Sequence, residues 1–389
     1  MNYFHWIAGC ILALVWFSRL LEAALGVPKI TDVSLPEWNR KPATGNPRVS
    51  IIVPARNEEE HIEQTLTRLL QLDYPDYDVI AVNDRSTDRT GEVMDRVAST
   101  PKGHQLLRVI HVSQLPPNWL GKAHAMWIGA NQANGEWLLF TDADVLFRPD
   151  TLTRTLAYAA AERADHVVLF PDFVMYGPGE RMMIAFFQTL FLFGHRPWKV
   201  ADPKTKDFMG VGAFNLIRRQ VYQAVGTYEA LRFEVLDDMK LGKVVKNGGY
   251  RQRNVFGRGL LSIRWAKSAM GVVENLTKNM FAVLSYQWWR ALASTFGLIF
   301  LNILPFAGVV LAHGWARAPY AVALASLFGI YVGMSRMSDI PAYYIVLHPV
   351  SSVLFVYILL RSMVLTLGRG GVVWRGTFYP LKELRKGMV

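Results

Sequence analysis

The sequence predicts an α/β protein built on a doubly wound, mostly parallel sheet, with transmembrane and interfacial helices at both ends. Two observations predict this class. Short β-branched segments alternate with a segment of helical period between residues 48 and 169, which is typical of parallel sheets with crossover helices. Long apolar runs lie near both ends of the chain, and each is of a length that can cross a bilayer.

Four strands are predicted, at residues 48–54, 77–83, 137–141 and 165–169. Between the first two, residues 58–72 place apolar side chains at the spacing of a helix. Polar clusters follow the first three strands, at 55–60, 84–88 and 142–144. Because ligands of such sheets bind at the carboxyl ends of the strands, these clusters predict a binding site.

The amino-terminal apolar run, residues 3–25, is either a cleaved signal peptide or a membrane anchor. Signal peptides begin with a positive charge, but no Lys or Arg precedes this run, whereas Lys29, Arg40, Lys41 and Arg48 follow it. The positive-inside bias therefore places the amino terminus outside and the following domain in the cytosol. We expect an integral membrane protein, in the plasma or inner membrane if the source is bacterial.

Composition limits the partners. The formal net charge of +11 is compatible with nucleic acid, anionic lipid or phosphorylated substrates. No nucleic-acid-binding motif is present, and the bases cluster beside apolar segments, so we expect a membrane surface and phosphate, and no nucleic acid. The single cysteine, Cys10, excludes disulfides within the chain and a cysteine zinc site.

Asp142 and Asp144 are separated by one small residue after an apolar strand. A solvated turn would explain such a pair, but two carboxylates at a buried strand end also suit Mg²⁺ or Mn²⁺ that binds a diphosphate. Asp84 follows another strand, where its carboxylate could accept hydrogen bonds from a nucleoside. Asp237 and Asp238 are adjacent and point to different sides of a helix, so one of them could face a pocket as a general base. The alternative is a charged helix surface, with Lys240 and Lys243 nearby.

These pieces together resemble glycosyltransferase family 2, whose members are inverting enzymes with the Rossmann-like GT-A fold. The matching segments, in the family's order, are VSIIVPARNEEEHI at 49–62, VNDRSTDRT at 82–90, LGKAHA at 120–125, FTDADV at 140–145 and VLDDMKLG at 235–242. The arrangement of an anchor, a central domain and carboxyl-terminal membrane segments is similar to the ceramide glucosyltransferase, hopanoid-associated and carotenoid glycosyltransferase branches. The tail Val373–Gly376 is also similar to those branches.

The resemblance implies a role for particular side chains. The metal would be bound by Asp144 and Asp142, and the base would be Asp238, with Asp237 beside it. The donor nucleotide would contact Pro54, Ala55, Arg56, Glu58, Asn83, Asp84, Lys122 and Asp142, and the acceptor or diphosphate would contact Gly212, Arg264 and Trp265. The family commonly has Asp where this chain has Asn83, which leaves UDP and GDP donors open, with UDP preferred.

We therefore expect transfer of a sugar from a nucleoside diphosphate sugar to a hydroxyl of a membrane lipid, with one inversion at the anomeric carbon. A processive polysaccharide synthase is the alternative within the family, but Leu261–Trp265 keeps only Arg-Trp of its Q-x-x-R-W motif. A non-catalytic membrane protein or transporter is the alternative outside it. The predicted domains are an anchor at 1–26, a linker at 27–47, a catalytic domain at 48–280 and a membrane region with a basic tail at 281–389.

Three carboxyl-terminal segments could cross the membrane, at 291–313, 318–334 and 341–367. The tail is basic, so it should share the cytosol with the catalytic domain, which requires an even number of crossings. We expect 341–367 not to cross, because His348-Pro349 should break its helix. Residues 182–193 are apolar nearly all round and predict either a buried core helix or an interfacial helix that guides a lipid.

Overall fold

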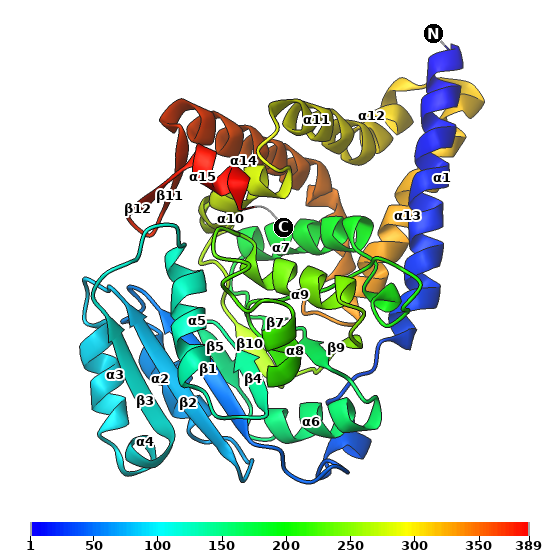
Figure 1. The fold of residues 1–389 in the computed structure, drawn as a ribbon. Coiled ribbons are helices and arrows are strands. Elements are labelled where there is room, and N and C mark those ends of the chain that lie inside the picture. The colour runs from blue at the N-terminus through cyan, green and yellow to red at the C-terminus, as the bar shows by residue number, and fades with distance from the viewer. Residues whose placement is uncertain (1, 388–389) are drawn as a thin grey trace. The chain divides into compact units, whose positions relative to one another are not determined.

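The computed structural model describes residues 2–387 (Figure 1). The chain divides into two compact units, and each is described by itself. The first contains residues 2–29, 175–196 and 265–374, and the second contains residues 30–174, 197–264 and 375–387. The predicted continuous domain 48–280 does not have these boundaries, because two of its segments belong to the first unit and the tail belongs to the second.

The second unit is built on a seven-stranded sheet in the order β3-β2-β1-β4-β8-β6-β9. Its strands are β1 (Val49–Ala55), β2 (Tyr77–Asp84), β3 (Leu107–Val112), β4 (Trp137–Phe140), β6 (His166–Leu169), β8 (Asn215–Arg218) and β9 (Gln252–Val255). Only β8 runs antiparallel to its neighbours. The predicted mostly parallel sheet and its four strands are confirmed, while β3, β8 and β9 were not predicted.

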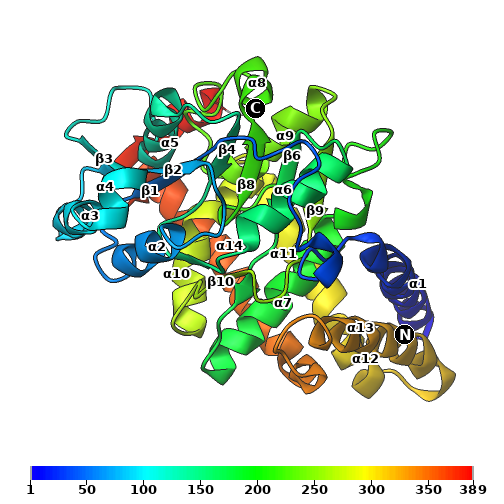
Figure 2. The same ribbon diagram turned by 90° about the horizontal axis from the view of Figure 1, so that it is seen from below.

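Helices cover both faces of this sheet. The helices of this unit are α2 (Ile62–Leu69), α3 (Thr90–Ala98), α4 (Pro101–Leu106), α5 (Gly121–Gln132), α6 (Thr151–Ala161), α8 (Arg219–Ala224), α9 (Asp237–Asn247) and α15 (Leu381–Lys386), with 3₁₀ turns at Pro36–Trp38 and Pro197–Lys199. Figure 2 shows α5 on one face and α2 and α3 on the other. Fully buried β-branched residues of β1, such as Ile51 and Val53, form the core between these layers. The layers are those of a doubly wound fold.

A second sheet of three short strands, β5 (Val145–Phe147), β10 (Leu261–Ile263) and β7 (Asp172–Phe173), belongs to the same unit. The predicted linker is partly ordered within this unit: Asp32 bridges to Phe256, next to the end of β9, and the Arg154 guanidinium of α6 donates to backbone carbonyls of residues 33–35.

The first unit is helical. Its elements are α1 (Asn2–Gly26), α7 (Pro178–Gly194), α10 (Ala269–Val283), α11 (Trp288–Asn302), α12 (Leu304–Leu311), α13 (Ala318–Ser335) and α14 (His348–Arg369), the 3₁₀ turns Val27–Lys29, Gly314–Arg317 and Ala342–Leu347, and the short strand β11 (Gly371–Trp374). Both views show α1 running beside α13. Among the described residues, three helical segments are long and apolar enough to cross a membrane, at 3–29, 314–335 and 342–369.

The prediction that His348-Pro349 breaks a helix is wrong. Pro349 lies in the first turn of α14, where its missing N–H has no helical partner to lose, so it starts a continuous 22-residue helix. The break occurs instead between α11 and α12, which meet at a bend of 47°. At that bend Asn302 hydrogen-bonds His348 (3.0 Å), whose other ring nitrogen contacts the Tyr331 hydroxyl (2.9 Å). These bonds satisfy polar groups that lie among apolar helices.

Helix α7 contains residues 182–193, for which sequence left two interpretations open. Met183 and Phe186 are fully buried in an apolar cluster with Val272 of α10 and Phe355 of α14. The helix therefore packs as core within the first unit on one face, and the interfacial role remains a prediction.

Candidate active site

The predicted site lies where three neighbouring strands of the second unit end. Strand β1 runs parallel to β2 and to β4, with Ala55 in register with Asn83 and Ile52 in register with Phe140. The loops that follow these strands therefore leave the same edge of the sheet. They carry Arg56 and Glu58, then Asp84, then Asp142 and Asp144.

Asp84 is the last residue of β2 and is only 3% exposed. The Arg85 guanidinium holds both of its oxygens, with Nε 2.8 Å from Oδ1 and Nη2 3.0 Å from Oδ2. Arg56 Nη1 lies 3.9 Å from Oδ2. A side chain at Gly121 would overlap the same carboxylate, so glycine is required there. The two cations compensate a buried negative charge and fix its orientation.

The other residues predicted to contact the nucleotide have little side-chain surface or hydrogen-bonding capacity left for a ligand. Asn83 accepts from the backbone N–H of Ser86 (3.3 Å) and contacts the His111 ring (3.0 Å), so its amide is already engaged. Pro54 and Ala55 are within β1, and Ala55 is only 2% exposed, so it can offer a ligand little beyond its backbone.

Lys122, in the first turn of α5, joins two of the predicted acidic groups. Its Nζ lies 2.8 Å from Asp142 Oδ1 and 3.5 Å from Asp237 Oδ1. Burial opposes its charge, but the carboxylates of Asp142, Asp237 and Asp238 outweigh that effect and raise the pKa of Lys122. The lysine is therefore a fixed cation at the centre of the site.

Asp144 has an environment that a cation would relieve. Burial, and then repulsion from Asp142 and Glu58, raise the pKa of the Asp144 carboxyl to about 7. No group of three or more acidic, His or Cys side chains within residues 2–387 is arranged as a complete metal site. Two carboxylates with phosphate completing the coordination is the arrangement that Mg²⁺ prefers, so the donor set fits such an ion.

Asp237 and Asp238 begin α9 and differ in access. Asp237 is 3% exposed, its Oδ2 has no hydrogen-bond partner, and burial raises its pKa to about 7 despite Lys122. Asp238 is half-buried, accepts from the backbone N–H of Met239 (2.7 Å) and Gly212, and has a pKa that burial raises. Asp238 is thus the more accessible of the two carboxylates, and it is the one that the family resemblance implies as the base.

Gly212 lies between the two acidic groups. Its carbonyl accepts from the Asp142 N–H (3.1 Å), and a Cβ at this position would overlap Asp142 Oδ2. The predicted segment around it, residues 210–215, leads directly into β8. Gly212 therefore touches the site through its backbone.

Two predicted residues are separated by the division into units. Arg264 ends a segment of the second unit, whereas Trp265 begins a segment of the first, where its ring packs at 4.8 Å from that of Phe187. Their predicted acceptor role remains a prediction.

Sequence reasoning missed several residues that touch the site. Arg85 directly follows Asp84 within a quoted motif, so a signal was present. Arg375, Thr377 and Tyr379 come from the tail and contact Glu58, Arg56 and Gly121. The one signal for Arg375 in the sequence is its place in the segment 373–376, which is similar to the tails of related branches.

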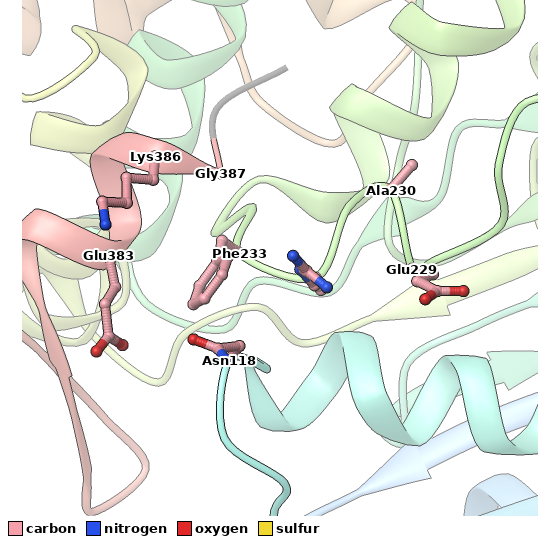
Figure 3. A pocket seen from close by; sticks show the side chains of 8 residues that line it. Asn118, Glu229, Ala230, Phe233, Glu383, Lys386 and Gly387 are labelled. Carbon is pink, nitrogen blue, oxygen red and sulfur yellow. The ribbon is translucent and has the colours of Figure 1, made fainter.

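A cavity of about 660 Å³ lies within the second unit, where the end of the tail meets residues 118 and 229–233. Figure 3 shows Glu383 and Lys386 of α15 on one side, Asn118 below, and Glu229 and Ala230 on the far loop. The lining also includes Arg232, Phe233 and Gly387. In the sequence, Lys122 comes shortly after Asn118 of the lining, and Asp237 comes shortly after Phe233. The Leu120 N–H donates to the Arg232 carbonyl (2.7 Å) and joins these two segments.

Comparisons with known proteins agree with this geometry. Residues 50–226 match the family model described as Glycosyl transferase family 2. The 4,4'-diaponeurosporenoate glycosyltransferase of Staphylococcus aureus (strain bovine RF122 / ET3-1) is 22% identical over 385 residues, covering 95% of this chain and 99% of that protein. The protein of the same name from Staphylococcus haemolyticus is 23% identical over 235 residues, 60% of each chain.

Among solved structures, the mannosyltransferase PcManGT from Pyrobaculum calidifontis, in complex with GDP-Man and Mn²⁺, has a TM-score of 0.54. It is 21% identical and covers 90% of this chain and 99% of its own. The chain shares the GT-A fold with that structure. Residues 50–226 match the model of glycosyltransferase family 2, to which the sequence motifs showed a resemblance.

Proposed function

We propose that this enzyme transfers a sugar from a nucleoside diphosphate sugar to a membrane lipid, with inversion at the anomeric carbon. The observation that carries the proposal is a set of carboxylates at two neighbouring strand ends and one helix start: Asp84 ends β2, Asp142 and Asp144 follow β4, and Asp238 begins α9. Lys122 pairs with Asp142 and with Asp237, the neighbour of Asp238. A transporter or scaffold has no use for buried carboxylates in this arrangement.

The donor would bind across the strand ends. Asp84, held by Arg85, is suited to accept from the imide or ribose of a nucleoside. Asp142 and Asp144 would bind Mg²⁺ or Mn²⁺, which supplies positive charge for the departing diphosphate. Lys122 adds a fixed cation beside them.

Asp238 would take the proton from an acceptor hydroxyl. Its carboxylate is oriented by two backbone N–H groups and its raised pKa makes it a stronger base than an ordinary aspartate. The acceptor oxygen then bonds to the anomeric carbon as the bond from that carbon to the diphosphate oxygen breaks. A single displacement inverts the anomeric centre.

The acceptor class follows from the membrane helices and the relatives. The Staphylococcus relatives are named 4,4'-diaponeurosporenoate glycosyltransferases, so we propose a carotenoid-type or similarly long apolar lipid for this chain. The cavity lined by Phe233 and Arg232 adjoins Asp237 along the chain and is proposed as the entrance for the polar end of the acceptor. Asp238 would be needed as a base only for a hydroxyl acceptor, because a carboxylate acceptor is already deprotonated near neutral pH.

The division of the chain into two units supports an even number of membrane crossings by the carboxyl-terminal segments. Residues 30–174, 197–264 and 375–387 fold into one compact unit, so we infer that the membrane segments between residues 264 and 375 return the chain to the same side of a membrane. Of the bent pair α11–α12, α13 and α14, we propose that the bent pair is re-entrant. Both ends of the pair carry exposed Trp and Arg, at 288–290 and 315–317, as expected of segments at one membrane surface.

Cysteine labelling tests this arrangement. Replacing Cys10 by Ser gives a chain without cysteine, into which Trp315→Cys and Arg385→Cys are placed singly. Both should label only after the cytosolic side is opened. Labelling of Trp315→Cys from outside would show that the bent pair crosses.

The activity itself is tested with the full chain in detergent, Mn²⁺ and a panel of UDP- and GDP-sugars, with extracted membrane lipids and apocarotenoids as acceptors. We expect a single-sugar lipid by mass spectrometry and loss of product with EDTA. Long polysaccharide, or no glycosylated product from any donor, would contradict the proposal.

A further inference from the structure

The tail that follows the last membrane helix contributes side chains to the donor site. Residues 375–387 belong to the same compact unit as the strand ends. Within it, Arg375 and Gly376 reverse the chain, β12 (Thr377–Pro380) follows, and α15 packs with Gly387 against Phe233. We call residues 375–379 the strap.

The strap contacts every donor loop that sequence singled out except the Asp142 loop. The Arg375 guanidinium hydrogen-bonds the Glu58 carboxylate and the Arg56 carbonyl. Thr377 Oγ1 accepts from Arg56 Nη1 at 3.0 Å. The first contact places a cation beside the carboxylates that would bind the metal, because Glu58 is one of the charges that act on Asp144.

Tyr379 links two further parts of the site. Its hydroxyl accepts from the Gly121 N–H at 3.1 Å and from the Arg85 guanidinium. Helix α5 has no side-chain cap of its own at Leu120, so Tyr379 satisfies an N–H that would otherwise lack a helical partner. The tyrosine is 6% exposed, which fixes its position. It thereby steadies both Lys122's helix and the arginine that holds Asp84.

The backbone at Arg375 is unusual for its residue type. Arg375 has φ of +46° and Gly376 has φ of +77°. Turns that need two left-handed residues are normally built from Asn, Asp or Gly, because a larger side chain is disfavoured there. An arginine at this position is explained by what its side chain binds and not by the turn.

We propose that the strap completes the donor site, with Arg375 as a binding residue for the diphosphate of the donor and Tyr379 as a positioning residue for the nucleoside end. The inference rests on the proposed nucleotide-sugar chemistry. A divalent cation that binds with the diphosphate would compete with Arg375 for the carboxylates of Glu58 and Asp144. The planar guanidinium of Arg375 could then pair with phosphate oxygens instead. Arg56 and Arg85 keep their partners in the strap.

The test is equilibrium binding to the full chain in detergent, with UDP, GDP, uridine and guanosine as probes, each with Mg²⁺ and with EDTA. Arg375→Ala should weaken binding of the preferred diphosphate by about 10- to 100-fold, the usual range for a charge-assisted contact, and leave binding of the matching nucleoside unchanged. Arg375→Lys should recover part of the loss. Tyr379→Phe should weaken nucleoside and diphosphate about equally, by roughly three- to tenfold.

The matched control is Lys382→Ala, an exposed base in the same tail, which should bind all four probes as the wild type does. Wild-type affinity of Arg375→Ala for the diphosphate would overturn the strap and leave the proposed function standing. An equal loss for nucleoside and diphosphate in Arg375→Ala would show a merely structural role and also overturn it. Failure of the wild-type chain to bind either diphosphate would overturn both.

Discussion

A buried histidine ties the sheet to the loop that supports the base. His166 of β6 is fully buried, and its Nε2–H donates to Asn215 Oδ1 (3.1 Å) while its Nδ1 accepts from Gln252 Nε2 (2.8 Å). Gln252 Oε1 in turn accepts from the Met209 N–H (2.9 Å), three residues before Gly212. This network holds a neutral ring in one tautomer, so protonation of His166 would break it.

The cost can be worked out from the pKa. Burial lowers the pKa of His166 from 6.5 to about 4, and a separation of about 2.5 pKa units corresponds to about 3.4 kcal/mol. Because the unfolded chain binds the proton more readily, the stability is complete above pH 6.5 and is lost as the pH falls toward 4. Between pH 7 and pH 5 we expect this residue to remove about 2 kcal/mol.

The assay compares the wild type with His166→Gln, which cannot titrate. Chemical denaturation of the full chain in detergent, followed at pH 7, 6 and 5, should show the variant less stable at pH 7. The difference should shrink by about 2 kcal/mol at pH 5. A difference that does not change with pH would refute the reasoning, since all other titrating groups are common to both chains.

Three further predictions concern the site. Asp238→Asn should lower kcat for a hydroxyl acceptor by about 10²- to 10⁴-fold and leave nucleotide affinity unchanged. Undiminished turnover of a hydroxyl acceptor in a coupled nucleotide-release assay would refute its role as the base. Gly212→Ala should displace Asp142 and reduce kcat/KM at least about tenfold, whereas Gly177→Ala, with no atom within 4 Å of the added carbon, should not. Ala230→Trp should fill the cavity and raise KM for the lipid alone, and an unchanged acceptor KM would remove the cavity from the acceptor path.

The sequence by itself determined the class of sheet and most of the acidic site. Strands such as 49–55 are short, β-branched runs, and the polar residues that follow them must meet when parallel strands share an edge. Asp84, Asp142 and Asp144 could therefore be placed from local pattern alone. The antiparallel β8 could not, because its direction depends on pairing with β4 and β6 and not on its own residues.

Tertiary structure decided what the ends of the chain do. Whether Pro349 breaks or starts a helix depends on where the helix begins, and this is set by packing and by the bond from His348 to Asn302. Arg375 lies more than three hundred residues from Glu58 in sequence, and no periodicity relates them. Only folding of residues 375–387 beside the strand ends makes that basic tail part of the proposed nucleotide site, because charge pairing acts through space and not along the chain.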